Sequence, residues 1–142
     1  AGEYDELSTH KMGALQIKQQ ARIDLIFQYT IDQYAQNISL DEIASYAGLS
    51  VPAFCNYFRK STKKTYIEFL NEVRIGKACQ QLIDTQKTIS EIAYECGYNT
   101  LANFNKQFLK VRGMQPKQYR KIFSASTEVQ IPSLEIDGKL YS

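Results

Sequence analysis

A chain of 142 residues, 44% hydrophobic and 23% charged, is long enough for one domain with a hydrophobic core or for two small ones, and too short for a barrel enzyme. This composition argues against wholesale disorder, and no apolar run approaches the roughly 20 residues that a membrane-spanning helix needs. The formal net charge of +2, taken alone, argues against a strongly polyanionic partner.

The N-terminal part of the chain divides into two kinds of sequence. Residues 1–16 show no periodicity, and we expect a linker or tag remnant with little order. From about Ile17 to Tyr34 the apolar residues recur at helical spacing, which predicts an amphipathic helix. We expect this helix to cover the unit that follows it, so that residues 17–64 form a first helix-turn-helix subdomain.

A repeated unit is the strongest pattern in the chain. SLDEIASYAGL (39–49) recurs as TISEIAYECGY (88–98) at an offset of 49 residues. A hydroxyl residue followed three residues later by glutamate predicts a capping box at each start, and Gly48 and Gly97 predict left-handed helix ends. Phenylalanines four apart then mark the buried face of a second helix in each unit: Phe54 with Phe58, and Phe104 with Phe108.

The rest of the chain connects or follows these units. Residues 65–85 contain no proline and predict one long connecting helix, in which Tyr66 to Asp84 would span roughly 28 Å. Residues 86–123 form the predicted second subdomain, with Pro116 opening a last short helix. The tail, residues 124–142, is either loose or forms a short strand laid on a neighbouring element. The predicted fold is all-α, with about seven helices in two helix-turn-helix subdomains joined by a long helix.

The distribution of charge changes the meaning of the small total. Residues 50–125 carry thirteen basic and five acidic side chains, a net charge of +8, whereas the segments before and after them carry −4 and −2. A basic block that coincides with two helix-turn-helix patterns is typical of nucleic-acid binding. The alternative is a pair of helical hairpins from a scaffold or repeat protein with a solvated lysine-rich surface.

Other chemistry lacks its usual residues. Three widely spaced cysteines without a CxxC pair fit a reducing cytoplasm, and His10 is the only histidine, so neither a zinc site nor a histidine-activated nucleophile is expected. Glu91 and Glu95 are one helical turn apart like an acid/base pair, but Glu91 is explained by its capping box and Glu95 has no evident partner. The sequence therefore predicts neither a metal, a cofactor nor an enzyme.

These motifs resemble the DNA-binding domain of the AraC/XylS family of bacterial transcription regulators. The resemblance covers about Arg22 to Lys121 and includes SLDEIA, GLS before Phe54, FLNEVRIGKACQQLI, SEIAYECGY, FNKQF and GMQPKQYRK. It implies two helix-turn-helix subdomains, each placing its second helix in a major groove of promoter DNA. It also implies regulation of transcription initiation through RNA polymerase.

The resemblance assigns roles to the solvent-facing residues of the two recognition helices. Asn56 suits adenine, Asn105 and Lys106 are the hydrogen-bonding base readers of the second helix, and Lys106 suits guanine. The remaining base-facing positions offer only apolar contacts. The base-reading set is Pro52, Cys55, Asn56, Leu101, Ala102, Asn105 and Lys106. The phosphate-contacting set is Ser50, Arg59, Lys60, Lys63, Lys64, Thr100, Lys110, Arg112, Lys117 and Arg120.

Three further expectations concern single positions and the length of the chain. Arg74 is interpreted as a structural ion-pair partner of Glu42 or Glu91. Lys63 stands where the family usually has glycine, so a lysine must take the left-handed conformation or the loop must be built differently. Because few residues precede the match, the chain is expected to be a fragment of a longer regulator whose effector binds an upstream domain, with a short stand-alone regulator as the alternative.

The competing function is a helical protein-interaction module without DNA binding. In that case the acidic N-terminal helix and the acidic tail would be the working surfaces. Replacing Asn105 and Lys106 by alanine distinguishes the two functions, because only a DNA reader loses DNA affinity while staying folded.

Overall fold

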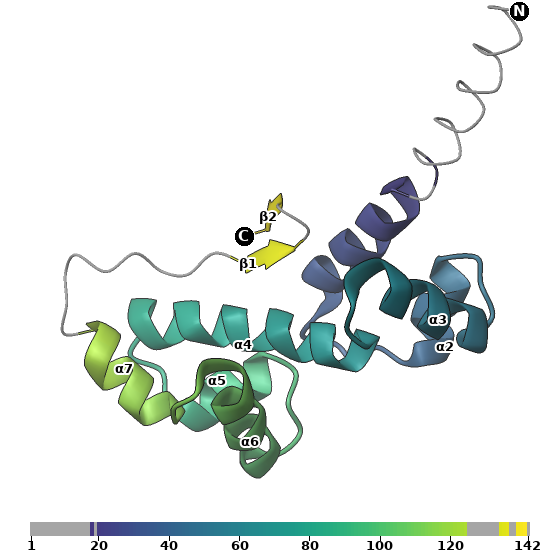
Figure 1. Ribbon diagram of the computed structural model, residues 1–142. Helices are drawn as coiled ribbons and strands as arrows, with labels where there is room; N and C mark the ends of the chain where they lie inside the picture. Colours follow the sequence, from purple (N-terminus) through teal and green to yellow (C-terminus); the bar gives the residue numbers. More distant parts are fainter. Residues whose placement is uncertain (1–17, 19, 125–133, 137–138, 142) are drawn as a thin grey trace, which may run out of the picture.

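The computed structural model describes residues 18, 20–124, 134–136 and 139–141 (Figure 1). Seven helices lie within these residues and confirm the predicted helical fold. The N-terminal helix comprises, among the described residues, residue 18 and residues 20–33. The others are α2 (Leu40–Tyr46), α3 (Val51–Thr62), α4 (Tyr66–Asp84), α5 (Ile89–Glu95), α6 (Leu101–Arg112) and α7 (Pro116–Ser124). None of the helices in this part of the chain is both long and apolar enough to cross a bilayer.

The two predicted helix starts differ in one detail. At α5 the Thr88 hydroxyl accepts from the Glu91 backbone N–H (3.1 Å), and the Glu91 carboxylate accepts from the Thr88 N–H (3.2 Å), which completes a capping box. At α2 the Ser39 hydroxyl also caps the helix. The prediction of a second box was wrong, because the Glu42 carboxylate instead accepts a 2.6 Å hydrogen bond from the Tyr29 hydroxyl.

Two helices end at a glycine in the left-handed conformation, as predicted. Gly48 and Gly97 have φ angles of +74° and +97°, and the amide of the residue after each glycine donates back to the preceding helix. At the end of α3, Lys63 takes the left-handed conformation itself, with φ 64° and ψ 18°. The loop is thus built as in the second unit, where Gly113 ends α6, but with a lysine in the strained position.

Two hydrophobic cores share α4, which lies between the subdomains in Figure 1. The first core joins the N-terminal helix, α2 and α3 to the first half of α4, around Phe27, Phe58 and Phe69. The second joins α5, α6 and α7 to the other half, from Ile75 to Leu82. The connecting helix is therefore part of both cores.

The tail contains a small element outside the helical body. Strands β1 (Leu134–Ile136) and β2 (Lys139–Tyr141) pair antiparallel, with Glu135 opposite Leu140. The predicted alternative of a short strand laid on a neighbour is correct in strand type only, because these two strands pair with each other. The expectation for residues 1–16 lies outside the described residues.

Candidate nucleic-acid interface

Each recognition helix is built by the same local devices. Ser50 and Thr100 are the N-caps of α3 and α6, and their hydroxyls accept from the backbone amides of Ala53 (3.3 Å) and Asn103 (3.1 Å). One face of each helix is fixed by its fully buried phenylalanine pair. The opposite face of each helix is left for solvent.

On α3 the predicted base-reading residues share this outer face. Pro52, Cys55 and Asn56 are all exposed, one turn apart on the side away from the phenylalanine pair. Only Asn56 among them carries hydrogen-bonding groups that suit a base edge. The arrangement predicts a surface that reads mostly through shape and apolar contact.

On α6 the predicted residues are only partly together. Ala102 and Lys106 are exposed, whereas Asn105 is half-buried and Leu101 packs partly against the second core. Asn103, which the sequence reasoning missed, is exposed on the first turn. Aligning it with the exposed Ala53 of the first unit could have found it. Its Oδ1 accepts a long 3.4 Å hydrogen bond from Gln107.

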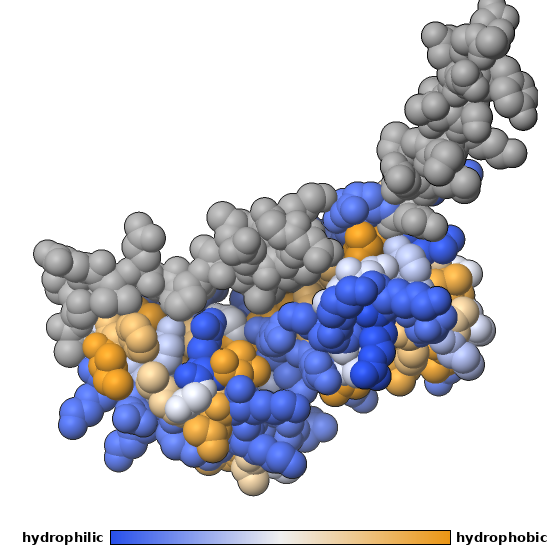
Figure 2. Space-filling view, viewed as in Figure 1, coloured by the Kyte–Doolittle hydropathy of each residue, from blue (hydrophilic) through white to orange (hydrophobic). Residues whose placement is uncertain are grey.

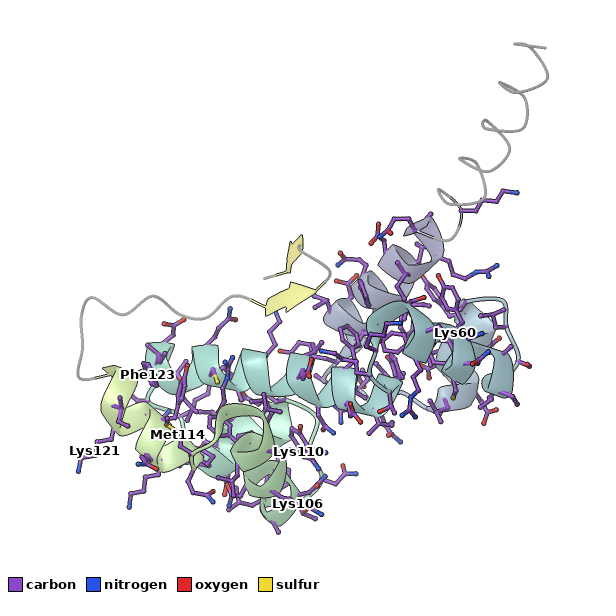
Figure 3. All side chains as sticks on the ribbon, in the orientation of Figure 1. Lys60, Lys106, Lys110, Met114, Lys121 and Phe123 are labelled. Atoms are coloured by element: carbon purple, nitrogen blue, oxygen red, sulfur yellow. The ribbon has the colours of Figure 1, made fainter. Side chains whose placement is uncertain are left out.

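The flanking cations fall into two groups. Arg59, Lys60, Lys63, Lys110 and Lys117 are exposed. Figure 3 places Lys60 on α3 and Lys106 and Lys110 on α6, and Figure 2 shows hydrophilic side chains gathered over these helices. This group provides positive charge beside both recognition helices.

The second group is engaged within the protein. Lys64 forms a 2.7 Å ion pair with Glu72, and Arg112 is half-buried, with its guanidinium beside the Cys79 thiol. Arg120 donates from Nε to the Leu82 carbonyl (2.9 Å) and from Nη2 to the Thr85 carbonyl (3.3 Å), so it caps the end of α4. Arg112 and Arg120 therefore serve the protein's own packing and are not assigned to the DNA interface.

Arg74 has the structural role expected of it, but the expected partners were wrong. Its Nε donates to the Tyr34 carbonyl (2.8 Å) and its Nη2 to the Gln36 carbonyl (2.9 Å), rather than to Glu42 or Glu91. Its guanidinium carbon also lies 5.5 Å from the centre of the Tyr98 ring. The sequence pattern contains no signal for these backbone acceptors.

The titratable groups described here show no arrangement for metal binding. No cluster of three His, Cys, Asp or Glu side chains lies within the described residues. Burial raises the pKa of the Cys79 thiol and raises that of Cys96 to about 12, so both are held as neutral thiols. Cys55, by contrast, is an exposed free cysteine on the outer face of α3.

Two helix-turn-helix units sharing one connecting helix define the fold class, a double helix-turn-helix domain. A model of a helix-turn-helix domain family matches residues 43–122. An uncharacterized HTH-type transcriptional regulator of Bacillus subtilis, YdeC, is 30% identical over 91 residues, which are 64% of this chain and 31% of that protein. The chain belongs to the AraC-type helix-turn-helix family of transcription regulators, as the resemblance implied.

Solved structures with the same fold agree. The C-terminal domain of AraT, a response regulator from Geobacillus stearothermophilus, is 28% identical with a TM-score of 0.67, covering 80% of this chain and 91% of that one. The DNA-binding domain of AdpA, a global transcriptional factor solved in complex with a target DNA, is 21% identical with a TM-score of 0.67, covering 70% and 90%. The chain spans a third or less of the length of the first curated relatives it matches.

Proposed function

We propose that this chain binds double-stranded promoter DNA sequence-specifically, with α3 and α6 in successive major grooves about 34 Å apart. The observation that carries the proposal is the pair of capped helices, each with a buried phenylalanine pair on one face and exposed residues on the opposite face. The DNA-bound AdpA domain, which has the same fold, supports it.

Base reading is assigned to the outer faces of both helices. On α6 we assign Asn105 and Lys106, with Leu101, Ala102 and Asn103 beside them. On α3 we assign Asn56 with Pro52 and Cys55. Hydrogen-bonding side chains are fewer on α3, so α6 carries more of the direct sequence discrimination.

Phosphate contacts are assigned to the exposed cations and to the two helix N-termini. The backbone amides at the starts of α3 and α6 favour an anion, and Ser50 and Thr100 hold these ends in place. The exposed set is Arg59, Lys60, Lys63, Lys110 and Lys117. Lys64 is also assigned a phosphate contact, in addition to its ion pair with Glu72. Each phosphate neutralised adds about 0.9 to the slope of log affinity against log salt.

The test is a selection from random duplexes followed by anisotropy titration of the selected sequence at several salt concentrations. Replacing both Asn105 and Lys106 by alanine should lower affinity by about 100-fold or more, because each of the two good base contacts contributes about 10- to 100-fold. Lys121→Ala is the matched control, because it removes the same charge from α7, where Figure 3 shows the side chain well apart from Lys106. Salt-independent affinity, or an equal loss in the control, would contradict the proposal.

The remaining elements of the proposal belong to the whole regulator. They are control of transcription initiation through RNA polymerase, an effector acting through an upstream domain, a cytoplasmic location, and action by binding rather than catalysis. A reporter gene placed behind the selected sequence tests the first of these. Expression that is unchanged by the double Asn105/Lys106 variant would contradict it.

A second candidate function, binding of a protein partner, has one observation in its favour. Leu25 and Tyr46 are 55% and 50% exposed, and the Tyr46 ring stacks at 4.4 Å on that of Tyr29, beside the Glu42 carboxylate. If this function replaced DNA binding, alanine at Leu25 and Tyr46 would abolish activity in the reporter assay and the Asn105/Lys106 variant would not.

A further inference from the structure

The two subdomains meet where the N-terminal helix ends, in addition to sharing α4. Tyr34 lies at this point and packs partly against both hydrophobic cores. The carbonyls that follow a helix end have no partner within the helix and need donors. Arg74, from the middle of α4, supplies two such donors to the carbonyls of Tyr34 and Gln36.

The turn of the second helix-turn-helix unit closes on the same place. A Cβ atom at Gly97 would lie 2.8 Å from the Tyr34 carbonyl oxygen, 3.2 Å from that of Ala35 and 3.0 Å from Arg74 Nε. The equivalent Gly48 of the first unit also has a positive φ, but a Cβ atom there would meet nothing within 4 Å. Glycine is therefore favoured at 48 by backbone conformation alone, and at 97 by conformation and close packing together.

Tyr98 completes the contact from the second subdomain. Its ring lies under the Arg74 guanidinium, and its hydroxyl donates a 2.7 Å hydrogen bond to Asn71 Oδ1 on α4. Arg74 thus touches the end of the N-terminal helix on one side and the turn of the second unit on the other. Tyr34, Arg74, Gly97 and Tyr98 are called the junction below.

We propose that the junction fixes the separation and orientation of α3 and α6, and so makes the protein select DNA half-sites by their spacing. This inference rests on the proposed DNA-binding function. Inserting one base pair moves a half-site by about 3.4 Å and rotates it by about 34° around the duplex. A pair of helices held both by α4 and by the junction cannot follow that change, whereas a pair held by α4 alone can follow it by a bend or twist of α4 between the two cores.

The first experiment tests, without DNA, whether the junction holds α3 and α6 at one distance from each other. Spin labels on the native Cys55 of α3 and on a Leu109→Cys variant of α6 report the distance between the recognition helices, since Cys79 and Cys96 are buried. We expect one narrow distance distribution in this background, and a broader or shifted one after adding Arg74→Ala or Gly97→Ala.

Gly48→Ala is the matched control for these distances, because it introduces the same left-handed strain without the steric contact. Its distribution should stay narrow. Circular dichroism confirms that each variant is folded, and Arg74→Lys, which keeps the charge but loses the fork of donors, replaces Arg74→Ala if that variant does not fold. Equal distributions in all variants would overturn the role of the junction.

The second experiment measures spacing selectivity on the duplex that the wild-type chain selects from random DNA. Affinity is compared between this duplex and versions with one base pair inserted or removed between the half-sites. We expect the ratio of the two affinities to fall by about tenfold or more in Arg74→Ala, which loses both hydrogen bonds of a charged group, and to be kept in Gly48→Ala.

The two measurements separate the possible failures. Unchanged spacing ratios in Arg74→Ala and Gly97→Ala would overturn the inference while leaving DNA binding intact. If the wild type selects no sequence at all, the proposed function fails and spacing selectivity fails with it, although the spin-label distances still decide whether the junction is rigid.

Discussion

Replacing Lys63 by glycine should stabilise the protein, although it removes a side chain from the end of a helix. Lys63 holds φ 64° and ψ 18°, and its backbone N–H donates to the Arg59 carbonyl at 2.9 Å. It is the one residue other than glycine with a positive φ among those described. A left-handed conformation is unfavourable by about 1–2 kcal/mol for a residue with a Cβ atom, and glycine avoids this strain.

The expected gain is smaller than the strain itself. Glycine has more conformational freedom in the unfolded chain, which offsets about 0.5–1 kcal/mol of the benefit. The net increase in the free energy of unfolding is therefore about 1 kcal/mol, or about 4 °C in Tm for a domain of this size. The Lys63 backbone hydrogen bond can form equally well with glycine.

The assay is urea unfolding followed by circular dichroism, with thermal unfolding as a second readout. Gly113→Ala is the reverse control, because it replaces glycine at the equivalent position of the second unit. Gly113 has a φ of +74°, and a Cβ atom there would meet nothing within 4 Å. It should lose about 1 kcal/mol by the same reasoning. A Lys63→Gly variant that is no more stable than wild type, combined with a destabilised Gly113→Ala, would refute the strain at Lys63.

Three further predictions follow from burial and capping. A thiol reagent at neutral pH should modify Cys55 alone in the folded protein and all three cysteines after unfolding, because Cys79 and Cys96 are buried and burial raises the pKa of their thiols. Rapid modification of all three cysteines in the folded protein would contradict this. Stability to urea should fall between about pH 9 and 12, because burial raises the pKa of Cys96 and of Tyr66 to about 12 in the folded protein. The folded state then keeps protons that the unfolded state releases near pH 9 and 10, so rising pH favours unfolding. A stability that does not change over this range would contradict the prediction. Thr88→Ala should lose about 1 kcal/mol in urea unfolding through loss of the capping box, and an unchanged midpoint would show that the box does not stabilise α5.

The helices could be predicted because their signals are local. Ser39 and Thr88 cap helices whose starts depend on a few neighbouring residues, and the proline-free segment from Tyr66 to Asp84 forms α4 with the predicted bounds. Phe54 and Phe58 are buried because helical spacing alone puts them on one face.

Partners that come from distant parts of the chain were not predictable in the same way. Glu42 has the spacing of a capping box, but Tyr29, thirteen residues earlier, lies within hydrogen-bond distance and takes its carboxylate. Arg74 was expected to find a carboxylate and instead finds backbone carbonyls about forty residues away. Which acceptor a guanidinium meets depends on how two helices cross, and helical periodicity carries no such information.

The repeated unit explains why the solvent-exposed faces of α3 and α6 could be predicted in outline but not residue by residue. The second helices of the two units are offset by 50 residues, as Phe54 and Phe104 show, and this offset pairs Cys55 with Asn105. Cys55 is exposed and Asn105 is half-buried, so equivalent positions do not have equal access to solvent. Such differences cannot come from capping or periodicity, since both units share these features. They reflect the surroundings of each recognition helix, and only one of the two units has its turn glycine packed against the other subdomain. The structural symmetry of the repeat is therefore broken at the outer faces of α3 and α6 and at Gly97, and we expect the functional differences between the halves to lie there.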